Sequence, residues 1–469
     1  MDLCHAVEGH YTWRREGGVP LVFIIPIMFD LSPARDAQFR SMRDTAREIF
    51  ASALKNASVE SAFARHVQSD RGVLRIREDL YDLDSYQRVF VVAMGKGAHT
   101  MTEALVDQVG GRLEGIVASS VEPVSQVHGF RYFRGGHPTP TAESIHAAEA
   151  ILKSLNSLNV ASLAIFLLSG GGSSIVEKPA DDEVLLPDLI ETYRLLVHSG
   201  APIAEINAIR KHLSAVKGGR LAQAAFPAQQ VSVLVSDVPD STPDALASGP
   251  TMPDSTSVPD CERIAAQYGM IERLPSAVAD LFRQHLLEET PKSDDPAFVR
   301  ARWWTVLSNK VAVEEAAAAA AGTGFAVEVD NSCDDWDYKK AADHLLRRLR
   351  ELRRTVSRVC LISGGEVTVS VRSGGTGGRN QQFALACAEK IAGDDITVFS
   401  GGTDGIDGNS PAAGAVVDGS TLARAGGREA LRGALSSFNA YPMFESLGDA
   451  VVTGPTGNNL RDLRILLAY

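Results

Sequence analysis

Short, unbroken apolar runs that end at polar or glycine-rich turns constrain the fold of this chain more than any other feature. Three stand in the N-terminal half, at Val89 to Met94, Ala164 to Leu168 and Val231 to Val235. Strands buried on both faces have this composition, because helices cover both sides of a parallel sheet. Stretches with helical periodicity, such as Ala204 to Val216, separate the runs. The pattern therefore predicts an α/β fold built on a parallel sheet.

The length of 469 residues exceeds what one compact core usually serves, so two domains are expected. The charged, proline-bearing segment from Glu288 to Pro296 is the best linker, and the strand–helix alternation resumes beyond it. We expect an N-terminal domain over 32–290 and a smaller C-terminal α/β domain over 300–469. Residues 1–31 include an apolar run, Val19 to Phe29, which is too short to span a membrane. We expect residues 1–31 to be a poorly ordered extension, or the result of a translation start placed too far upstream, with Met28 as the candidate true start. A signal peptide is the less favoured alternative.

Composition excludes several classes of protein. The formal net charge of −12 argues against a nucleic-acid binder, which needs a basic face. Any anionic substrate must then be held by local lysines and arginines. The five cysteines are scattered and form no CxxC pair, which favours a reduced cytoplasmic enzyme over a disulfide framework or a zinc site.

Two turns of the N-terminal half could bind phosphate. Gly95-Lys96-Gly97 follows a buried strand, so its lysine can reach an anion at the next helix; a plain turn with a solvated lysine is equally compatible. The loop Ser169-Gly170-Gly171-Gly172-Ser173-Ser174 offers exposed amides flanked by hydroxyls, although a merely flexible loop is the alternative.

The stretch from Ser363 to Gly408 has the same character. We expect a strand at Glu366 to Val371, then the glycine-rich loop with Gly377 and Gly378, and a helix opening near Arg379 and Asn380. A cation at a helix start is disfavoured by the helix dipole unless an anion shares the site, so Arg379 is a candidate for stabilising a transferring phosphoryl group.

Three aspartates are candidate Mg²⁺ ligands, because magnesium prefers oxygen donors. Asp237 follows the strand Val231 to Val235, where it could bind the ion or activate a hydroxyl, or serve as a turn residue. Asp404 and Asp407 stand in a glycine-rich loop and could equally be Asx-turn residues. We assign Arg210, Lys217 and Glu366 to the substrate, although a solvated basic helix face explains the first two as well.

Taken together, these segments resemble the class II glycerate kinases, whose C-terminal part is called the MOFRL domain. The matching pieces run in order from about Pro33 to the end: AMGKGA (93–98), GGHPTPT (135–141), LLSGGGSS (167–174), INAIRKHLSAVKGGRLA (206–222), VSDV (235–238), ASGPT (247–251), SGGEVTV (363–369), GGRNQQ (377–382), GGTDGIDG (401–408) and TGPTGNN (453–459).

The resemblance implies a larger Rossmann-like N-terminal domain, a smaller MOFRL domain and a site in the cleft between them. It further implies ATP- and Mg²⁺-dependent phosphorylation of D-glycerate, typically to 2-phosphoglycerate, with Lys96 and Arg379 as the catalytic pair. The segment SDVPDSTPD and the residues Asn409-Ser410-Pro411 depart from the family pattern, which affects loop details.

Two other functions remain to be separated from this one. A hydroxypyruvate reductase acts on a related three-carbon acid but needs a dinucleotide fingerprint, and no GxGxxG is present. A non-enzymatic sensor of nucleotides or phosphometabolites could use the same scaffold. We expect neither a membrane nor a nucleic-acid partner, and we leave a homodimer open. Because the two halves supply different parts of the site, closure of the cleft should assemble it.

Overall fold

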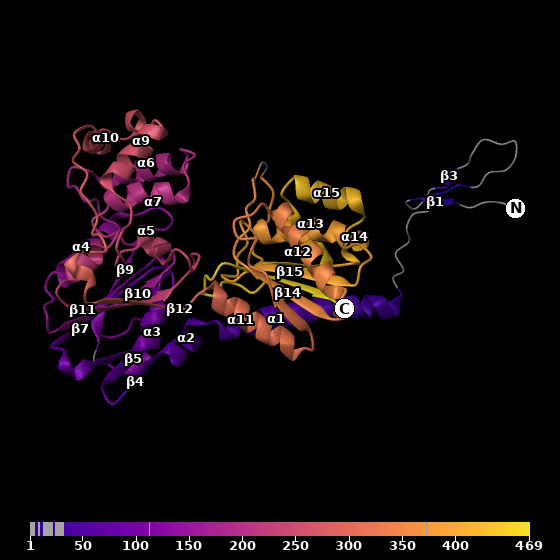
Figure 1. The fold of residues 1–469 in the computed structure, drawn as a ribbon, viewed down its shortest axis with the longest axis horizontal. Coiled ribbons are helices and arrows are strands. Elements are labelled where there is room, and N and C mark those ends of the chain that lie inside the picture. Colours follow the sequence, from indigo (N-terminus) through magenta and orange to yellow (C-terminus); the bar gives the residue numbers. More distant parts are fainter. Residues whose placement is uncertain (1–4, 8–9, 13–21, 24–31, 112, 372–373) are drawn as a thin grey trace.

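Two six-stranded sheets, lying side by side, carry the fold (Figure 1). The computed structural model describes residues 5–7, 10–12, 22–23, 32–111, 113–371 and 374–469. The expected disorder of residues 1–31 falls largely outside the described residues. Within that segment, β1 (His5–Val7), β2 (His10–Thr12) and β3 (Val22–Phe23) pair as a small antiparallel sheet.

The first large sheet is entirely parallel, in the order β12-β11-β10-β7-β8-β9, which confirms the predicted α/β class. Its strands are β7 (Arg88–Met94), β8 (Glu114–Ser119), β9 (Phe130–Arg134), β10 (Ser162–Ser169), β11 (Gln229–Val235) and β12 (Ala301–Leu307). Every residue of β10 is buried, which explains the apolar run in its sequence.

Helices cover this sheet, and four of them form an outlying lobe (Figure 1). The helices next to the sheet are α2 (Val59–His66), α3 (Ala98–Val109), α4 (Ala142–Leu155), α5 (Gly172–Ile175) and α8 (Arg220–Ala225). The lobe consists of α6 (Leu186–Val197), α7 (Ile203–His212), α9 (Val258–Gln267) and α10 (Ser276–Arg283). A small antiparallel sheet of β4 (Val67–Asp70), β5 (Val73–Ile76) and β6 (Asp79–Asp82) completes this half.

The second large sheet is mixed, in the order β13-β14-β18-β15-β16-β17. Its strands are β13 (Ala326–Val329), β14 (Val359–Gly364), β15 (Ile396–Gly402), β16 (Gly414–Asp418), β17 (Ala450–Val451) and β18 (Asp462–Ala468). The C-terminal strand β18 lies antiparallel between β14 and β15. The associated helices are α1 (Pro33–Asn56), α11 (Asn309–Gly322), α12 (Tyr338–Arg353), α13 (Arg379–Lys390), α14 (Thr421–Arg424), α15 (Arg428–Ser436) and α16 (Ala440–Leu447).

Two sequence-based expectations about these elements are wrong. The stretch Glu366 to Val371 is no strand and keeps only an isolated bridge from Thr368, because Gly365, with φ of +82°, turns the chain away after β14. The helix expected over Ala204 to Val216 ends at His212.

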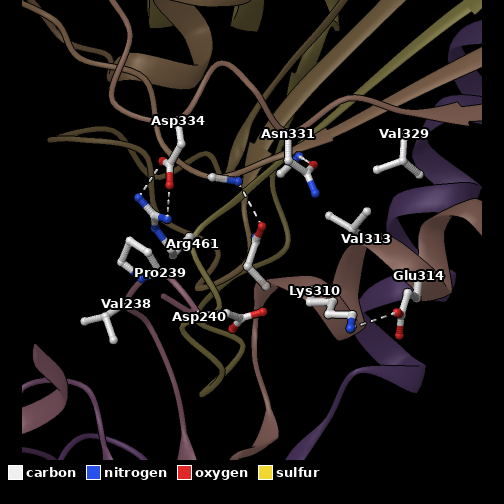
Figure 2. A pocket seen from close by; sticks show the side chains of 13 residues that line it. Val238, Pro239, Asp240, Lys310, Val313, Glu314, Val329, Asn331, Asp334 and Arg461 are labelled. Carbon is white, nitrogen blue, oxygen red and sulfur yellow. Dashed lines mark hydrogen bonds and ion pairs between the residues drawn. The ribbon is translucent and has the colours of Figure 1, made fainter. Parts of the chain in front are cut away.

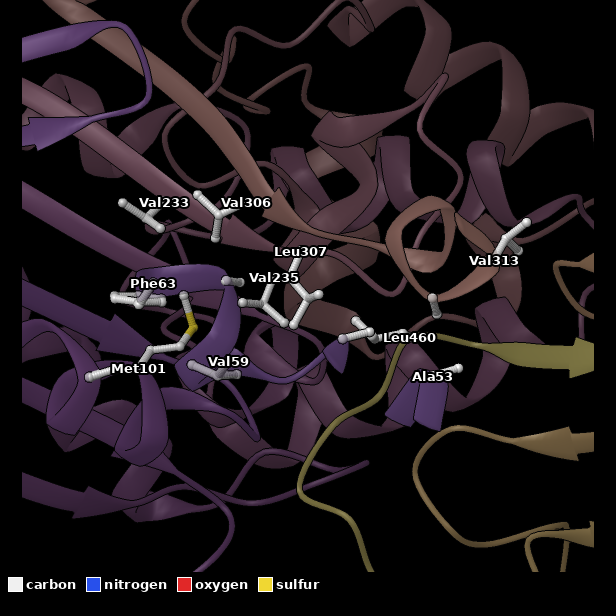
Figure 3. Close-up of a cluster of buried hydrophobic side chains, with 14 of the residues drawn as sticks. Ala53, Val59, Phe63, Met101, Val233, Val235, Val306, Leu307, Val313 and Leu460 are labelled. Atoms are coloured by element: carbon white, nitrogen blue, oxygen red, sulfur yellow. The ribbon is translucent and has the colours of Figure 1, made fainter. Parts of the chain in front are cut away.

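Helix α1 crosses between the two halves. It packs against α11, β15, β16 and β18 of the second sheet, whereas the next helix, α2, packs against α3 and β12 of the first. A shared apolar cluster joins the halves here, running from Val233 and Val306 through Leu307 to Ala53 and Val313 (Figure 3). We therefore propose that the domains comprise residues 58–307, and residues 33–56 together with 308–469. This division differs from the ranges expected from sequence, because β12 completes the first sheet.

Candidate functional site

The turn that carries Lys96 is joined directly to the glycine-rich loop of residues 169–174. At Gly95 φ is +119°, and a Cβ there would lie 2.3 Å from Oγ of Ser169, so the close approach of the two chains requires glycine. The N–H groups of the next two residues donate to the carbonyl of Gly170 and to the hydroxyl of Ser169, both at 2.9 Å. The carboxyl ends of β7 and β10 thus form one surface, as expected for a ligand site in a parallel sheet.

Asp237 and His137 reach the same surface. A Cβ added to Gly170 would lie 1.9 Å from Oδ2 of Asp237, and one added to Gly171 would lie 3.3 Å from Cγ of Lys96 and 3.4 Å from Nδ1 of His137. Burial, followed by the charge of Lys96, lowers the pKa of His137, so its ring is neutral at pH 7. Lys96, Asp237 and His137 therefore surround the glycine-rich loop.

The two serines that end this loop are held by neighbouring side chains. The hydroxyl of Ser173 lies 2.8 Å from that of Ser248, and the hydroxyl of Ser174 lies 3.2 Å from Nδ1 of His137. These contacts fix the loop in place, which favours a built site over the flexible-loop alternative.

Asp237 also faces the second domain. Its Oδ2 accepts a hydrogen bond of 3.4 Å from the side-chain amide of Asn459. Burial raises the pKa of Asp237, while the positive charges of Lys96 and Arg461 oppose that rise. One carboxylate therefore experiences a positive charge from each domain.

Arg379 is held by two carboxylates at the first position of α13. Its Nε donates to Oδ2 of Asp462 at 2.6 Å, and its Nη2 donates to Oδ1 of Asp462 at 3.0 Å and to Oε1 of Glu366 at 2.7 Å. Burial alone would lower the pKa of Arg379, but the hydrogen bond and charge of Asp462 outweigh it and raise the pKa. Among the described residues Nη1 has no hydrogen-bond partner, so its N–H groups are available to an anion.

Glu366 links the parts of the site electrostatically. Burial and the negative charge of Asp462 raise its pKa, and Arg379 and Arg461 oppose the rise. The carboxylate of Asp237 also contributes to this shift, so predicted site residues of both domains lie within electrostatic reach of one another.

Asp407 and Asp404 have local structural partners. Both carboxylate oxygens of Asp407 accept backbone N–H groups at the start of α13, from Asn380 at 3.0 Å and from Gln381 at 2.9 Å. Burial, against these hydrogen bonds, raises the pKa of Asp407 to about 6. Asp404 accepts the N–H of Ile406 at 3.1 Å, which forms an Asx turn. These contacts favour the structural alternative for both residues.

Gly377, Gly378 and Asn380 shape the loop that leads into α13. Gly377 has φ of +154°, and a Cβ added to Gly378 would lie 2.3 Å from Oδ1 of Asp407. The side chain of Asn380 is buried and accepts a hydrogen bond of 2.6 Å from Ser400, which joins the start of α13 to β15.

Arg210 and Lys217 belong to a separate buried network. The ammonium group of Lys217 pairs with Glu177, whose carboxylate also accepts the hydroxyls of Tyr193 and Ser214, each at 2.6 Å. The guanidinium of Arg210 lies 4.9 Å from the ring centroid of Tyr193. In the part of the chain that the structure describes, no hydrogen bond or ion pair joins either cation to Lys96, Asp237 or Arg379. The buried Glu177 pair favours a structural role for Lys217.

Two cavities flank this centre. The interdomain cavity, of about 460 Å³, lies between the domains (Figure 2). It is lined by Val238, Pro239, Asp240, Asn309, Lys310, Val313, Glu314, Val329, Asn331, Asp334, Gly364, Gly365 and Arg461. The arginine cavity, of about 720 Å³, includes Glu366, Gly377, Gly378, Arg379, Asp404 and Asp407.

The described residues contain neither a preformed cluster of metal-binding side chains nor a membrane-spanning helix. No three His, Cys, Asp or Glu side chains in the described ranges lie close enough together to hold a metal ion. Within the same ranges, no helix is long and apolar enough to cross a membrane.

Sequence reasoning missed four residues of this centre, His137, Asn459, Arg461 and Asp462. The motifs GGHPTPT and TGPTGNN pointed to two of these segments without indicating a role. Asp462 gave no signal, because its partner Arg379 precedes it by 83 positions and only strand pairing in the second sheet brings them together.

Comparison with known proteins places this geometry in a family. Residues 45–283 match the family model "Domain of unknown function (DUF4147)", and residues 359–462 match the "MOFRL family" model. A solved structure of glycerate kinase from Thermotoga maritima superimposes with a TM-score of 0.80 at 31% identity, covering 92% of this chain and 100% of that chain.

Sequence relatives also cover most of this chain, under two different names. D-glycerate 2-kinase from Thermotoga maritima is 34% identical, over 87% of this chain and 95% of its own length. A protein from Agrobacterium vitis named "Putative hydroxypyruvate reductase" is 35% identical, over 91% of this chain and 94% of its own length. The two family models match in sequence order, and the kinase relative and the kinase structure each cover most of the chain. The chain belongs to the MOFRL family of glycerate kinases.

Proposed function

We propose that this kinase transfers the γ-phosphoryl group of ATP to D-glycerate, giving 2-phosphoglycerate, in the space between its two domains. The observation that supports this most is the convergence of Lys96 and Asp237 from the first domain with Arg379, Glu366 and Arg461 from the second. Phosphoryl transfer needs positioning and charge stabilisation more than covalent chemistry, and a site of this kind supplies both.

Each cation has a free donor for an anion. The ammonium of Lys96 has no hydrogen-bond partner among the described residues, and its position over the loop of residues 169–174 suits a phosphate oxygen. Nη1 of Arg379 is likewise free, while Asp462 holds the guanidinium plane in one orientation. We propose that these two groups stabilise the charge of the transferring phosphoryl group and hold the glycerate carboxylate.

Asp237 fits a magnesium ion better than the other two candidate aspartates. Among the described residues, its Oδ2 accepts a long side-chain hydrogen bond of 3.4 Å from Asn459, whereas both oxygens of Asp407 accept helix N–H groups at 2.9–3.0 Å. Magnesium commonly takes one or two carboxylates together with substrate phosphates and water, so a cluster of three acids is not required. When bound, the ion would neutralise phosphate charge. Asp404 remains a predicted ligand whose Oδ1 is already engaged in an Asx turn.

The four described cysteines are free and buried, as a reducing compartment allows, so we propose that the kinase works in the cytoplasm. A homodimer stays an open prediction.

Phosphorus NMR of the product tests the proposal directly. Incubation with ATP, Mg²⁺ and D-glycerate should give the 2-phosphoglycerate resonance, and the 3-phosphoglycerate resonance alone would contradict the assigned position. Lys96→Ala and Arg379→Ala should each lower kcat by about 10²- to 10³-fold, as loss of charge stabilisation in the transition state predicts. Folded variants with near wild-type turnover would refute the site assignment.

Hydroxypyruvate reduction is the second candidate, because one relative bears that name. The same preparation should release ADP with glycerate and should leave NADH unoxidised with hydroxypyruvate. Oxidation of NADH without any ADP release would replace the kinase proposal.

A further inference from the structure

We propose that the interdomain cavity binds the nucleoside half of the phosphoryl donor, and that Arg461 contacts the donor's phosphate groups. This inference rests on the proposed kinase function, because it places one of that reaction's substrates. The cavity volume of about 460 Å³ lies within the usual range for small-ligand sites, about 300–1,000 Å³.

The apolar walls of the cavity come from both domains. Val238 and Pro239 follow β11 on one side, and Val313 of α11 and Val329 of β13 lie on the opposite side (Figure 2). A flat heteroaromatic base can be buried between two such apolar surfaces without losing hydrogen bonds at its edge. The arrangement fits a base better than it fits a small hydroxy acid.

The polar groups of the cavity fit a neutral, hydrogen-bonding ligand. Asp240 has no hydrogen bond or ion pair within the described ranges, so its carboxylate can accept from a ribose hydroxyl or an amino group. Oδ1 of Asn331 accepts the N–H of Gly364 at 2.8 Å, which leaves its amide NH₂ as a donor for a ring nitrogen.

The charges that line the interdomain cavity do not favour an acid as its ligand. Three carboxylates and two cations line the cavity. Glu314 lies 4.0 Å from Lys310, and Asp334 pairs with Arg461, so Asp240 is the carboxylate left over. An uncompensated negative charge disfavours glycerate inside this cavity. In the arginine cavity, by contrast, the N–H groups on Nη1 of Arg379, unoccupied among the described residues, can donate to that anion.

Arg461 stands between the interdomain cavity and the catalytic centre. Its Nη1 and Nη2 each donate to Asp334 at 2.7 Å, and its side chain is 7% exposed. It lines the cavity, and its charge also acts on Asp237. Its backbone has φ of +68°, which is uncommon for a long side chain and is found most often where function requires it. A nucleotide with its base in the interdomain cavity would extend its phosphates past Arg461 toward Asp237 and Lys96.

Filling the cavity from its exposed edge tests the nucleoside part. Val329 is 45% exposed, so Val329→Trp should fold, and Val356→Trp is the matched control because Val356 is 40% exposed and lines neither cavity. Calorimetric titration of the full chain should show at least about tenfold weaker binding of ATP and of adenosine to Val329→Trp, but wild-type binding to Val356→Trp. Inorganic tripolyphosphate, which lacks the nucleoside, should bind Val329→Trp normally and Arg461→Gln more weakly.

Wild-type affinity of Val329→Trp for ATP and adenosine would overturn the inference. A second measurement needs no variant: photolabelling of the wild-type chain with 8-azido-ATP should mark peptides containing residues 238–240 or 329–334, and labelling confined to the arginine cavity would also overturn it. Glycerate phosphorylation combined with either negative result would refute the nucleoside site and leave the proposed function standing. Labelling of the cavity without phosphorylation would refute the function and keep the site.

Discussion

Replacing Asp462 with asparagine should disable Arg379 without removing it. The variant keeps the shape of the side chain and the Oδ1 acceptor for Nη2 of Arg379, at 3.0 Å. It places an NH₂ group where Oδ2 now accepts Nε–H at 2.6 Å, so two donors face each other. The guanidinium must then leave its present plane.

The cost in stability follows from the burial of the pair. A charge-assisted hydrogen bond contributes about 1.5–3 kcal/mol, but the Arg379 side chain is 37% exposed and water can replace part of the loss. We expect the free energy of unfolding to fall by about 1–2 kcal/mol, which lowers Tm by a few degrees in a chain of this size. The effect on kcat should be larger, about 100-fold, because a displacement of about 1 Å in a positioned catalytic group has that consequence.

The assay is ADP release under saturating ATP and glycerate, with circular dichroism and thermal unfolding as checks on the fold. The control is Asp395→Asn, which alters the half-exposed pair of Asp395 with Arg35, an ion pair outside both cavities, and should keep wild-type kcat. Combining Asp462→Asn with Arg379→Ala should add little to the loss from Arg379→Ala alone, because the residues act as a unit. If Asp462→Asn keeps kcat within about twofold while Arg379→Ala is inactive, the positioning role is wrong.

Three further predictions follow from other parts of the structure. Gly95→Ala should unfold the turn or lower the free energy of unfolding by more than about 2 kcal/mol, because its Cβ would lie 2.3–2.8 Å from atoms of the adjoining strand. The control Gly433→Ala has open space around the new Cβ inside α15 and should be neutral or stabilising in urea unfolding. Equal effects of the two variants would contradict the packing argument. The carboxyl of Asp407 has a folded pKa of about 6, above its usual value of 3.8, so the native state binds a proton that the unfolded chain has released. The wild-type free energy of unfolding, relative to that of Asp407→Asn, should therefore fall by at most about 3 kcal/mol from pH 4 to pH 6 and stay level above pH 7. A rise across that window would show the opposite shift. Small-angle scattering should show compaction when an ATP analogue and glycerate bind together, and an unchanged radius of gyration would refute closure of the domains.

Local sequence pattern was sufficient to predict strands of the first sheet. Runs such as Val89 to Met94 and Val231 to Val235 are strands in the structure, because burial on both faces demands apolar side chains at every position. The turns after these strands were equally readable, since glycine at 95 and at 170–172 is required by chain approaches at the sheet edge.

Local sequence pattern does not predict the strand pairing of the second sheet. Its central strand β18 is the last strand along the chain and pairs antiparallel with β14 and β15. Contacts between residues 60 or more positions apart decide this pairing. The same long-range pairing brings Asp462 to Arg379 and Arg461 toward Asp237. The packing of α1 on the second sheet likewise depends on a core shared by both domains.

The sequence by itself determined the parallel sheet, the glycine-rich turns, and the choice of Lys96 and Arg379 as candidate anion-binding groups. Each of these depends on the geometry of a few neighbouring residues. Only the tertiary structure decided what those groups face. It pairs Lys217 with Glu177, uses Asp407 to cap α13, and holds Arg379 with Asp462, because burial and partner charge are set by segments that meet only in the folded chain.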